Sequence, residues 1–508
     1  MSVYDLTLYD IICRNARLYP ERIAWLEAEE NRAMTFAEYQ ASVERMASGL
    51  TAAGCCKGDR IGVIGKNCLA YLVLYGAAAA LGAIVVPINW RLSVDEMAYN
   101  LNDVQVRFLF ADGEDPEAMG AVSAKLGRDT KCYNLQARNG PFRDLVDAPL
   151  PEGGLPSRAV SADDGLVIIH TAAVAGRPRG ALLSHHNLLC ANAQLMQQIH
   201  LTQDDVHLNP LPMFHIAGLG MAFCCFHGGM LNINMRKFDA AQAARLIAEH
   251  KASVLFAFAP MMQTLLAHVA DSGEDISSLR AVLGIDRPEV IARYQEMTGG
   301  SFYSLFGQTE TSLVVTMSPF SERPGSAGRP MPLIDVQLMD DNDRPVPTGR
   351  AGEIAVRGPM VFKGYWGLDD ENAYTFRNGW HHTGDVGRFD EDGYLWYVAR
   401  KAEKELIKPG GENVYPAEVE KVILEHPAVA AVVVFGVPDP KWTEGIKAVC
   451  RLKSGESLTA KALIEFVGGR IARYKKPQYV QFVDELPLAA DGSPDRVKVK
   501  KLYGGPQA

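Results

Sequence analysis

The stretch from residue 166 to residue 187 constrains the fold more than any other part of this chain. It opens with Leu166–Ile169, a run of aliphatic and β-branched residues that predicts a strand buried on both faces. Ser184 near its end is a good helix N-cap, so we expect a helix to begin at His185. A buried strand, a loop and a helix start together are typical of a layered α/β protein.

The loop between this strand and this helix has the composition of an anion-binding site. Gly176 and Gly180 allow backbone N–H groups to approach a ligand, and Arg177 and Arg179 add positive charge. The helix start adds a partial positive charge. No Gly-Lys-Ser/Thr sequence closes the loop, so it is not a Walker loop. From these residues alone, an ordinary strand-to-helix turn explains the loop equally well.

The first 160 residues alternate between helix and strand patterns, which supports the same α/β fold class. Thr35 and Glu38 form a capping box at the start of one helix, and residues 59–65 and 107–112 are expected to be strands. Residues 69–88 are apolar and about long enough to cross a membrane. Their Ala-rich first part and Ile-Val-Val end favour a buried helix, a turn and a buried strand instead.

Length and charge limit the possible functions. A chain of 508 residues can bury a large core and should divide into two or more domains. Its 60 acidic residues outnumber its 51 Lys and Arg, so we expect no nucleic-acid partner. Nine cysteines without metal-ligand spacing indicate reduced thiols. The first ten residues lack the pattern of a signal peptide. We therefore expect a cytoplasmic protein with no integral membrane segment.

The glycine-bearing loop resembles the phosphate loop of adenylate-forming enzymes, the superfamily of acyl-CoA synthetases, luciferases and peptide-synthetase adenylation domains. That family has Thr-Ser-Gly-Thr-Thr-Gly-x-Pro-Lys-Gly, and this chain keeps its framework at Thr171, Gly176, Pro178 and Gly180. Arg179 replaces the lysine and keeps its charge. The middle hydroxyl residues are replaced by apolar ones, so the resemblance implies a triphosphate site with fewer side-chain donors.

A second resemblance lies in the Phe-Gly-Gln-Thr-Glu sequence from Phe306 to Glu310, which is similar to the family motif Tyr-Gly-x-Thr-Glu. The resemblance implies that Phe306 stacks on adenine, that Gly307 belongs to the nucleotide site, and that Thr309 meets the α-phosphate. It assigns the Mg²⁺ ion to Glu310, because Mg²⁺ prefers hard oxygen ligands and shares them with phosphate oxygens.

Two other segments resemble the family less closely. Pro-Met-Phe-His215 corresponds to a motif between nucleotide and acyl group, which makes His215 a pocket or gate residue and, with Arg179, Thr309 and Glu310, a candidate catalytic residue. Gly284 stands in the family's Gly-Gly-Ala-Pro segment, where backbone atoms contact adenine, but the next residue is Ile285. A lone histidine is more often structural than functional.

The nucleotide site continues through Asp385, Arg400 and the segment after it. Thr-Gly-Asp385 matches a family motif whose aspartate accepts both ribose hydroxyls, and a carboxylate at a strand end suits that task. The histidines at 381 and 382 should point apart on a strand, which argues against a metal site. Arg400 corresponds to an arginine that contacts ribose and phosphates, Lys404 to a hinge, and Gly411 to a turn that enters the active site.

The last part of the chain resembles the family's small mobile lid. We therefore expect an α/β protein with a large multi-layer N-terminal AMP-binding domain over residues 1–400 and an α+β lid over residues 401–508. The family's lid lysine is replaced by Ser493. Lysines at 498, 500 and 501 alternate with valines, which indicates a solvated strand face or a set of substitute cations.

The resemblance implies an AMP-forming acyl-CoA synthetase, an acid–thiol ligase that uses ATP, Mg²⁺ and coenzyme A. Its partner is a small-molecule carboxylic acid, and we expect an apolar one, fatty first and aryl second. A homodimer is compatible with these observations. Two alternatives stay open: a nucleotide-binding relative that has lost catalysis, and an adenylating enzyme that loads a carrier-protein thiol.

Overall fold

The structure is a computed structural model that describes residues 5–135, 140–150, 155, 159–171, 177–400, 405–409, 412–440, 442–489 and 493–505. The chain divides into two compact units. The large unit comprises residues 1–90, 98–170 and 180–399, and the small unit comprises residues 91–97, 171–179 and 400–508.

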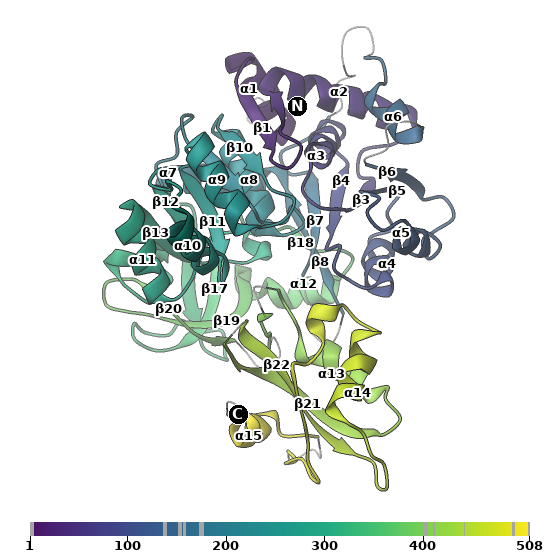
Figure 1. Ribbon diagram of the computed structural model, residues 1–508, viewed down its shortest axis with the longest axis vertical. Coiled ribbons are helices and arrows are strands. Elements are labelled where there is room, and N and C mark those ends of the chain that lie inside the picture. Colours follow the sequence, from purple (N-terminus) through teal and green to yellow (C-terminus); the bar gives the residue numbers. More distant parts are fainter. Residues whose placement is uncertain are drawn as a thin grey trace. The chain divides into compact units, whose positions relative to one another are not determined.

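Three sheets organise the larger part of the chain (Figure 1). The nine-stranded sheet contains, in spatial order, β15 (Arg329–Pro330), β14 (Thr316–Pro319), β13 (Ser301–Phe306), β12 (Ala281–Ile285), β11 (Val254–Phe258), β9 (Val206–Asn209), β10 (Leu231–Asn234), β1 (Ile23–Glu27) and β2 (Arg32–Thr35). The seven-stranded sheet contains β18 (Gly364–Tyr365), β8 (Arg179–Ser184), β7 (Gly165–Thr171), β4 (Ile84–Ile88), β3 (Arg60–Ile64), β5 (Phe108–Ala111) and β6 (Lys131–Asn134). The four-stranded sheet contains β16 (Asp335–Met339), β17 (Gly352–Arg357), β19 (His381–Phe389) and β20 (Leu395–Arg400).

The described residues contain fifteen α-helices, of which α13, α14 and α15 belong to the small unit. They are α1 (Leu8–Leu18), α2 (Phe36–Ala52), α3 (Leu69–Leu81), α4 (Val94–Asp103), α5 (Pro116–Ser123), α6 (Pro141–Val146), α7 (His185–Gln198), α8 (Ile216–His227), α9 (Ala240–His250), α10 (Met261–Ser272), α11 (Pro288–Thr298), α12 (Asp369–Thr375), α13 (Pro416–Leu424), α14 (Ala460–Gly468) and α15 (Arg496–Tyr503). Short 3-10 segments are η1 (Thr309–Thr311), η2 (Phe320–Glu322), η3 (Arg377–Gly379) and η6 (Arg473–Lys475).

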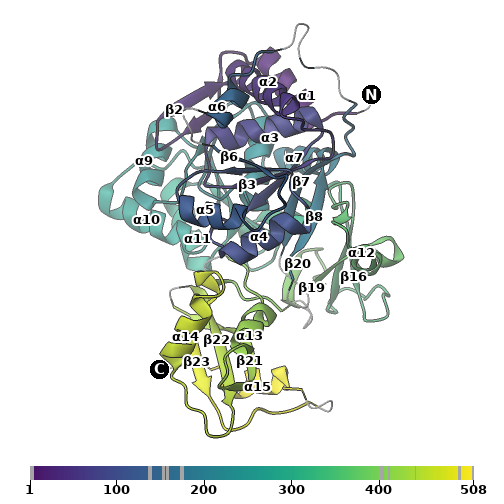
Figure 2. The ribbon, with the colours of Figure 1, turned by 90° about the vertical axis from the view of Figure 1, so that its right-hand side faces the viewer.

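The large unit is layered, as its sequence pattern predicts. One face of the nine-stranded sheet packs against α9, α10 and α11, which lie side by side in both views (Figures 1 and 2). The other face belongs to a core shared with α3, α8 and the seven-stranded sheet. Strands β11, β12 and β13 run parallel, so their carboxyl ends lie at one edge of the sheet. In open α/β sheets this edge is where ligands bind.

The apolar stretch of residues 69–88 is a buried helix and strand, α3 and β4, as expected. Gly82 ends α3 in the left-handed region at φ 66°, a conformation that glycine adopts without strain. Within the described residues, no helix is both long and apolar enough to cross a bilayer. The capping boxes expected at Thr35 and Ser184 are both present.

The small unit contains the sheet of β21 (Val429–Asp439), β22 (Thr443–Leu452) and β23 (Tyr479–Phe482), with α13 and α14 packed against a shared core. The expected strand face around the lysines at 498, 500 and 501 is wrong, because these residues lie in helix α15. Asp495 caps that helix by accepting from the backbone N–H of Lys498, and buried Val499 attaches it to the unit's second core.

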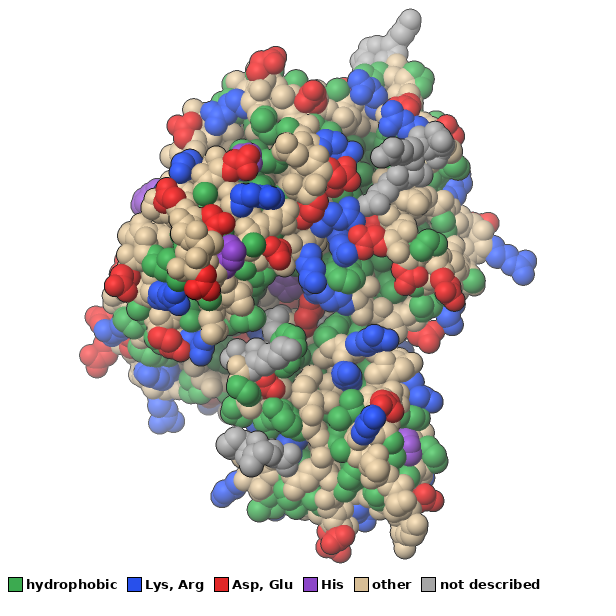
Figure 3. Space-filling view, in the orientation of Figure 1, with side chains coloured by type: hydrophobic (Ala, Val, Ile, Leu, Met, Phe, Trp, Pro, Cys, Tyr) green, Lys and Arg blue, Asp and Glu red, His purple; other side chains and the backbone are tan. Residues whose placement is uncertain are grey.

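Figure 3 shows red and blue side chains interspersed over much of the face that it draws. This distribution agrees with the near-balanced 51 basic and 60 acidic residues of the sequence. Such interspersed charges favour solubility.

Two buried histidines, His185 and His207, and the half-buried His227 should make the fold sensitive to acid. Burial lowers the pKa of His185, His207 and His227 from 6.5 to about 4. The unfolded chain therefore binds protons at a higher pH than the folded chain, so stability that is present above pH 6.5 is lost as the pH falls towards about 4. Each histidine then contributes a loss of about 3 kcal/mol in the free energy of unfolding.

Urea unfolding at a series of pH values from 7.5 to 4.5, a range chosen to span roughly this window, checks this expectation. His207→Gln should flatten the fall in the free energy of unfolding with pH, because it removes one of the protonation sites. The exposed His186 provides the matched control, and His186→Gln should not change the slope of the free energy of unfolding against pH. A slope that responds equally to both changes would contradict the assignment to buried histidines.

Candidate active site

The glycine-bearing loop follows strand β7, as expected, but it is shorter than the sequence suggests. Arg179 and Gly180 lie in strand β8 rather than in the loop, so the loop is followed by a strand and then by the helix α7. Thr171 Oγ1 donates to the backbone oxygen of Arg179 at 3.5 Å, and Arg179 is buried. A Cβ atom at Gly180 would lie 2.7 Å from Ile168 Cγ2, which explains a glycine there. Gly176 lies outside the described residues.

The Phe-Gly-Gln-Thr-Glu sequence begins at the carboxyl end of β13 and continues into η1. Phe306, Thr309 and Glu310 are all buried. A Cβ atom at Gly307 would lie 1.7 Å from the backbone oxygen of Leu313, so only glycine fits where the chain folds back on itself. Leu313 has φ 117°, a value that a branched side chain rarely adopts. Such strain is concentrated at functional sites.

The carboxylate of Glu310 is held in place by the hydroxyl of Tyr365, which donates to Oε1 at 2.9 Å. The backbone N–H of Phe362 donates to the backbone oxygen of Glu310 at 2.9 Å. Within the described residues, no group of three or more His, Cys, Asp or Glu side chains could hold a metal ion. One positioned carboxylate fits Mg²⁺, which usually takes one or two protein carboxylates and completes its shell with water and phosphate oxygens.

Asp385 lies in the middle of β19, so the expectation of a strand end is wrong. Gln308 Nε2 donates to Asp385 Oδ2 at 2.6 Å, and the hydroxyl of Tyr397 donates to Oδ1 at 3.2 Å. Gln308 Nε2 also donates to the backbone oxygen of Thr383 at 3.1 Å. Each carboxylate oxygen can accept more than one hydrogen bond, so this site still fits two ribose hydroxyls.

A buried ion network supports the strand that carries Asp385. Glu353 Oε1 accepts from the backbone N–H of Gly384 at 2.9 Å. Its Oε2 lies 3.1 Å from His382 Nδ1 and accepts from Arg377 Nη2 at 3.1 Å. No local sequence pattern marks Glu353, Gln308 or Tyr365 as site residues, because their partners are distant in sequence.

The carboxyl end of β12 also reaches this edge of the sheet. Gly284 has φ 154°, and a Cβ atom there would lie 1.9 Å from the backbone oxygen of Ala257 on β11. The following side chain, Ile285, is 54% exposed. The rings of Phe306 and Tyr397 have centroids 6.4 Å apart. A close backbone approach, the exposed side chain of Ile285 and an aromatic pair fit a flat ring such as adenine.

His215 is the N-cap of helix α8, and its Nδ1 accepts from the backbone N–H of Ala217 at 3.2 Å. Asn67 fixes the segment before it, because its Oδ1 accepts from Met213 N at 2.8 Å and its Nδ2 donates to Leu211 O at 2.8 Å. This cap gives His215 a structural task beside its expected role at the acyl pocket.

The remaining expected site residues belong to the small unit. Arg400 is the last residue of β20. Lys404 and Gly411 lie outside the described residues.

Comparison with known proteins adds to this geometry. The family model of AMP-binding enzymes matches residues 12–366, and that of the AMP-binding enzyme C-terminal domain matches residues 418–493. The chain is 36% identical to a feruloyl-CoA synthase from an Amycolatopsis species over 97% of this chain and 98% of the relative.

Two solved structures are also similar. One is provisionally named a long-chain-fatty-acid CoA ligase from Rhodopseudomonas palustris, with 43% identity, a TM-score of 0.74, and coverage of 78% of this chain and 100% of that chain. The other is an o-succinylbenzoate CoA synthetase from Bacillus subtilis bound to a product analogue. It has 28% identity and a TM-score of 0.87, and the match covers 98% of this chain and 99% of that chain.

Proposed function

Because this chain belongs to the family of AMP-binding enzymes, we propose that it activates an aryl-type carboxylic acid as its acyl-adenylate and transfers the acyl group to coenzyme A. The chain is an acid–thiol ligase of the AMP-forming CoA ligase type. Ligases of this type use ATP, Mg²⁺ and coenzyme A. The alternative of a relative without catalysis rests on the altered phosphate loop and on Ser493 in place of the lid lysine.

The observation that best supports the proposal is the hydrogen bond between Gln308 and Asp385. Gln308 lies in the segment that carries Glu310, and Asp385 is the proposed ribose carboxylate on β19. The hydrogen bond therefore joins two segments that lie 77 residues apart in the sequence. A metal carboxylate and a ribose carboxylate so placed can bind opposite ends of one nucleotide. The separate motifs of the sequence therefore belong to one site in this proposal.

Each side chain has a proposed task. Phe306 stacks on adenine and Asp385 accepts the ribose hydroxyls, while Thr309 and Arg179 donate to phosphate oxygens. When bound at Glu310, Mg²⁺ neutralises phosphate charge and thereby makes the α-phosphate a better electrophile. Catalysis then consists mainly of positioning the acid carboxylate in line with the α-phosphate and stabilising charge.

The acid is the finer part of the proposal. From the sequence alone we expect fatty acids before aryl acids, and here we propose the reverse order. The names of the feruloyl-CoA synthase and the o-succinylbenzoate CoA synthetase both denote aromatic acids. A fatty acid stays the second candidate, because the provisional name of the Rhodopseudomonas palustris protein denotes one.

The domain arrangement is proposed as well. Residues 1–400 form the AMP-binding domain in this proposal, and residues 401–508 form a lid that turns about Lys404 between the two half-reactions. Such closing motions commonly limit turnover. A cytoplasmic location and a homodimer stay predictions.

One assay series tests the proposed function. Exchange of labelled pyrophosphate into ATP is measured with a panel of aryl and fatty acids, and thioester formation with coenzyme A is then measured for each acid that supports exchange. We expect exchange and acyl-CoA formation with aryl acids. Absence of exchange with every acid would favour a relative without catalysis, and exchange without acyl-CoA would favour a carrier-protein thiol.

A further prediction concerns the lid lysine that Ser493 replaces. Ser493→Lys should speed pyrophosphate exchange about tenfold, because it restores a charge that neutralises the developing phosphate charge. The nearby lysines are poor substitutes: Lys498 pairs with Asp495 at 3.0 Å and Lys500 with Glu405 at 3.5 Å.

Lys501 makes no ion pair with any residue that the structure describes, so it is the neighbour to test. The prediction would be wrong if Ser493→Lys left exchange unchanged while Lys501→Ala selectively abolished it. Thioester formation from supplied acyl-adenylate is the control, because the lid lysine acts in adenylation only.

A further inference from the structure

Strand β19 bulges away from its neighbour β17 at residues 383–385. The register of the two strands shifts between Glu353 and Ala355 of β17, where a single residue, Ile354, faces the three residues of the bulge. A bulge bends its strand and re-aims the side chains, and bulges are common next to active sites. Asp385 is the last residue of this bulge, so the direction of its carboxylate depends on how the bulge is held.

Two side chains accept hydrogen bonds from the backbone of the bulge. Gly384 lies at its centre with φ 72°, a left-handed conformation that glycine adopts without strain. The N–H of Gly384 donates to Glu353 Oε1 at 2.9 Å. The N–H of Asp385 donates to Thr383 Oγ1 at 3.1 Å, and this hydroxyl donates to the backbone oxygen of Ile354 at 2.7 Å. Glu353 and Thr383 therefore hold the bulge from its two sides.

The carboxylate of Glu353 is itself fixed in place. Glu353 is 4% exposed, and its Oε2 accepts from Arg377 Nη2 at 3.1 Å and lies 3.1 Å from His382 Nδ1. Arg377 Nε also donates to both carboxylate oxygens of Asp343, at 3.1 and 2.9 Å. The N–H of Gly384 thus donates to a charged acceptor that cannot easily turn away, and such charge-assisted hydrogen bonds are the stronger kind.

Gln308 contacts both ends of the same bulge. Its Nε2 donates to the backbone oxygen of Thr383 at 3.1 Å and to Asp385 Oδ2 at 2.6 Å. A change in the shape of the bulge would alter the distance between these two acceptors and turn the Asp385 carboxylate. Glu353 can therefore act on Asp385 through the backbone of Gly384.

We propose that Glu353 is a positioning residue for recognition of the ribose. By accepting from the N–H of Gly384, it keeps the bulge in the shape that aims the Asp385 carboxylate at the ribose hydroxyls. The role assigned to Glu353 rests on the proposed function and deepens its nucleotide site. Hydrogen bonds weaken steeply as they leave their preferred direction, so a carboxylate that accepts two hydroxyls at once must be aligned with both.

The preference for ATP over 2′-deoxy-ATP tests this role, because the two nucleotides differ in one ribose hydroxyl. Dissociation constants of both are measured by calorimetric titration, which needs no acid substrate. The unchanged protein should bind ATP at least about tenfold more tightly, the scale for one hydrogen bond to a charged group. In Glu353→Ala the preference should fall to about twofold, because the turned carboxylate no longer accepts from the 2′-hydroxyl with good geometry.

Glu353→Gln separates positioning from stability. Its side-chain oxygen can still accept from the N–H of Gly384, but it lacks the charge that pairs with Arg377. We therefore expect a lower melting temperature with most of the preference for ATP kept. A purely structural role predicts instead that the preference falls in step with the melting temperature in both variants, and that result would overturn the proposal.

Asp205→Ala is the matched control, because Asp205 is another buried and ion-paired carboxylate of the large unit. Its oxygens accept from Arg280 Nε and Nη2 and from Ser253 Oγ, each at 2.7 Å. Asp205 directly precedes β9, which runs parallel to β11, so it lies at the amino edge of the nine-stranded sheet rather than at the carboxyl edge. Its loss should lower the melting temperature and leave the preference for ATP unchanged.

Thr383→Val tests the same bulge without removing a buried charge, should Glu353→Ala fail to fold. It removes the hydroxyl that accepts from the N–H of Asp385 and donates to Ile354. We expect the same fall in the preference for ATP. An unchanged preference in folded Glu353→Ala, or in Thr383→Val where Glu353→Ala does not fold, would overturn the role of Glu353.

Asp385→Ala distinguishes the failure of this role from the failure of the proposed function. It should abolish the preference for ATP, because it removes the acceptor itself. If Asp385→Ala lost the preference while the Glu353 variants kept it, the role of Glu353 alone would be wrong. If Asp385→Ala kept the preference, or if the unchanged protein showed none, the ribose site of the proposed function would be wrong, and the role of Glu353 with it.

Discussion

Replacing Glu310 by glutamine lowers pyrophosphate exchange by at least about a thousandfold, the scale on which removal of a positioned metal charge affects catalysis. An amide of the same shape carries no negative charge and is a weaker ligand for Mg²⁺. It still accepts the hydrogen bond that Tyr365 donates to Oε1, so the fold should persist. Exchange assays together with thermal unfolding separate the loss of chemistry from a loss of structure.

Tyr365→Phe is the matched control for Glu310→Gln. It removes the hydroxyl that holds the carboxylate and leaves the charge in place. We expect a much smaller effect, with a higher Mg²⁺ concentration needed for half-maximal exchange. Unchanged exchange in Glu310→Gln, or an equal loss in both variants at saturating Mg²⁺, would show that the charge of Glu310 does not hold the metal.

The second large effect is expected at Asp385. Asp385→Ala should weaken ATP binding by about 2–4 kcal/mol, the scale for two charge-assisted hydrogen bonds, which is roughly a 30- to 1,000-fold rise in Kd. The amide of Gln308 and the hydroxyl of Tyr397 then lose their shared acceptor. Calorimetric titration with ATP measures the change directly.

Asp335→Ala controls for loss of a carboxylate from the same four-stranded sheet. Asp335 lies on β16 and pairs with Arg357 at 2.8 Å at an exposed position. Its loss should leave ATP affinity as it is. If Asp385→Ala bound ATP as tightly as Asp335→Ala does, the assignment of Asp385 to the ribose would be wrong.

The sequence predicts best those elements that local patterns determine. The helix α3 and strand β4 follow from one apolar stretch, and the starts of α2 and α7 follow from capping residues that act within one turn. The lysine-rich segment near the end lies in a helix although its alternation predicts a strand, because five residues are too few to set a period. In α15 the two valines lie on different faces: Val499 is buried and Val497 is 77% exposed.

The candidate site was predictable only through its motifs. The family resemblance identifies Glu310 and Asp385, but nothing local indicates that Gln308 joins them. The support from Glu353 to the backbone of Gly384 spans 31 residues, and that from Tyr365 to Glu310 spans 55. The first contact crosses neighbouring strands of one sheet, and the second joins elements of different sheets. Single-sequence patterns encode neither pairing.

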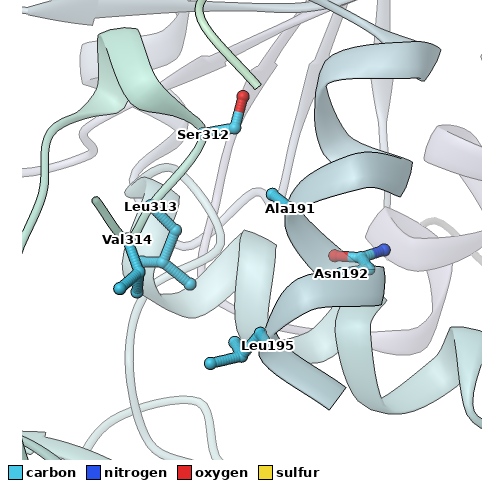
Figure 4. Close-up of a pocket in the computed structure, with 6 residues that line it drawn as sticks. All are labelled: Ala191, Asn192, Leu195, Ser312, Leu313 and Val314. Atoms are coloured by element: carbon cyan, nitrogen blue, oxygen red, sulfur yellow. The ribbon is translucent and has the colours of Figure 1, made fainter. Parts of the chain in front are cut away.

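The tight turn between Gly307 and Leu313 has a consequence for altering this enzyme by substitution. The same few backbone atoms set the direction of the Glu310 carboxylate and the position of the wall formed by Leu313 and Val314, because the chain closes on itself with no room for a Cβ at residue 307. Any substitution that shifts the backbone at Leu313 or Val314 would therefore also turn the Glu310 carboxylate and lower the catalytic rate. Helix α7 faces these two side chains through Ala191, Asn192 and Leu195 (Figure 4), so changes on α7 can alter the packing there and leave the backbone of the turn in place.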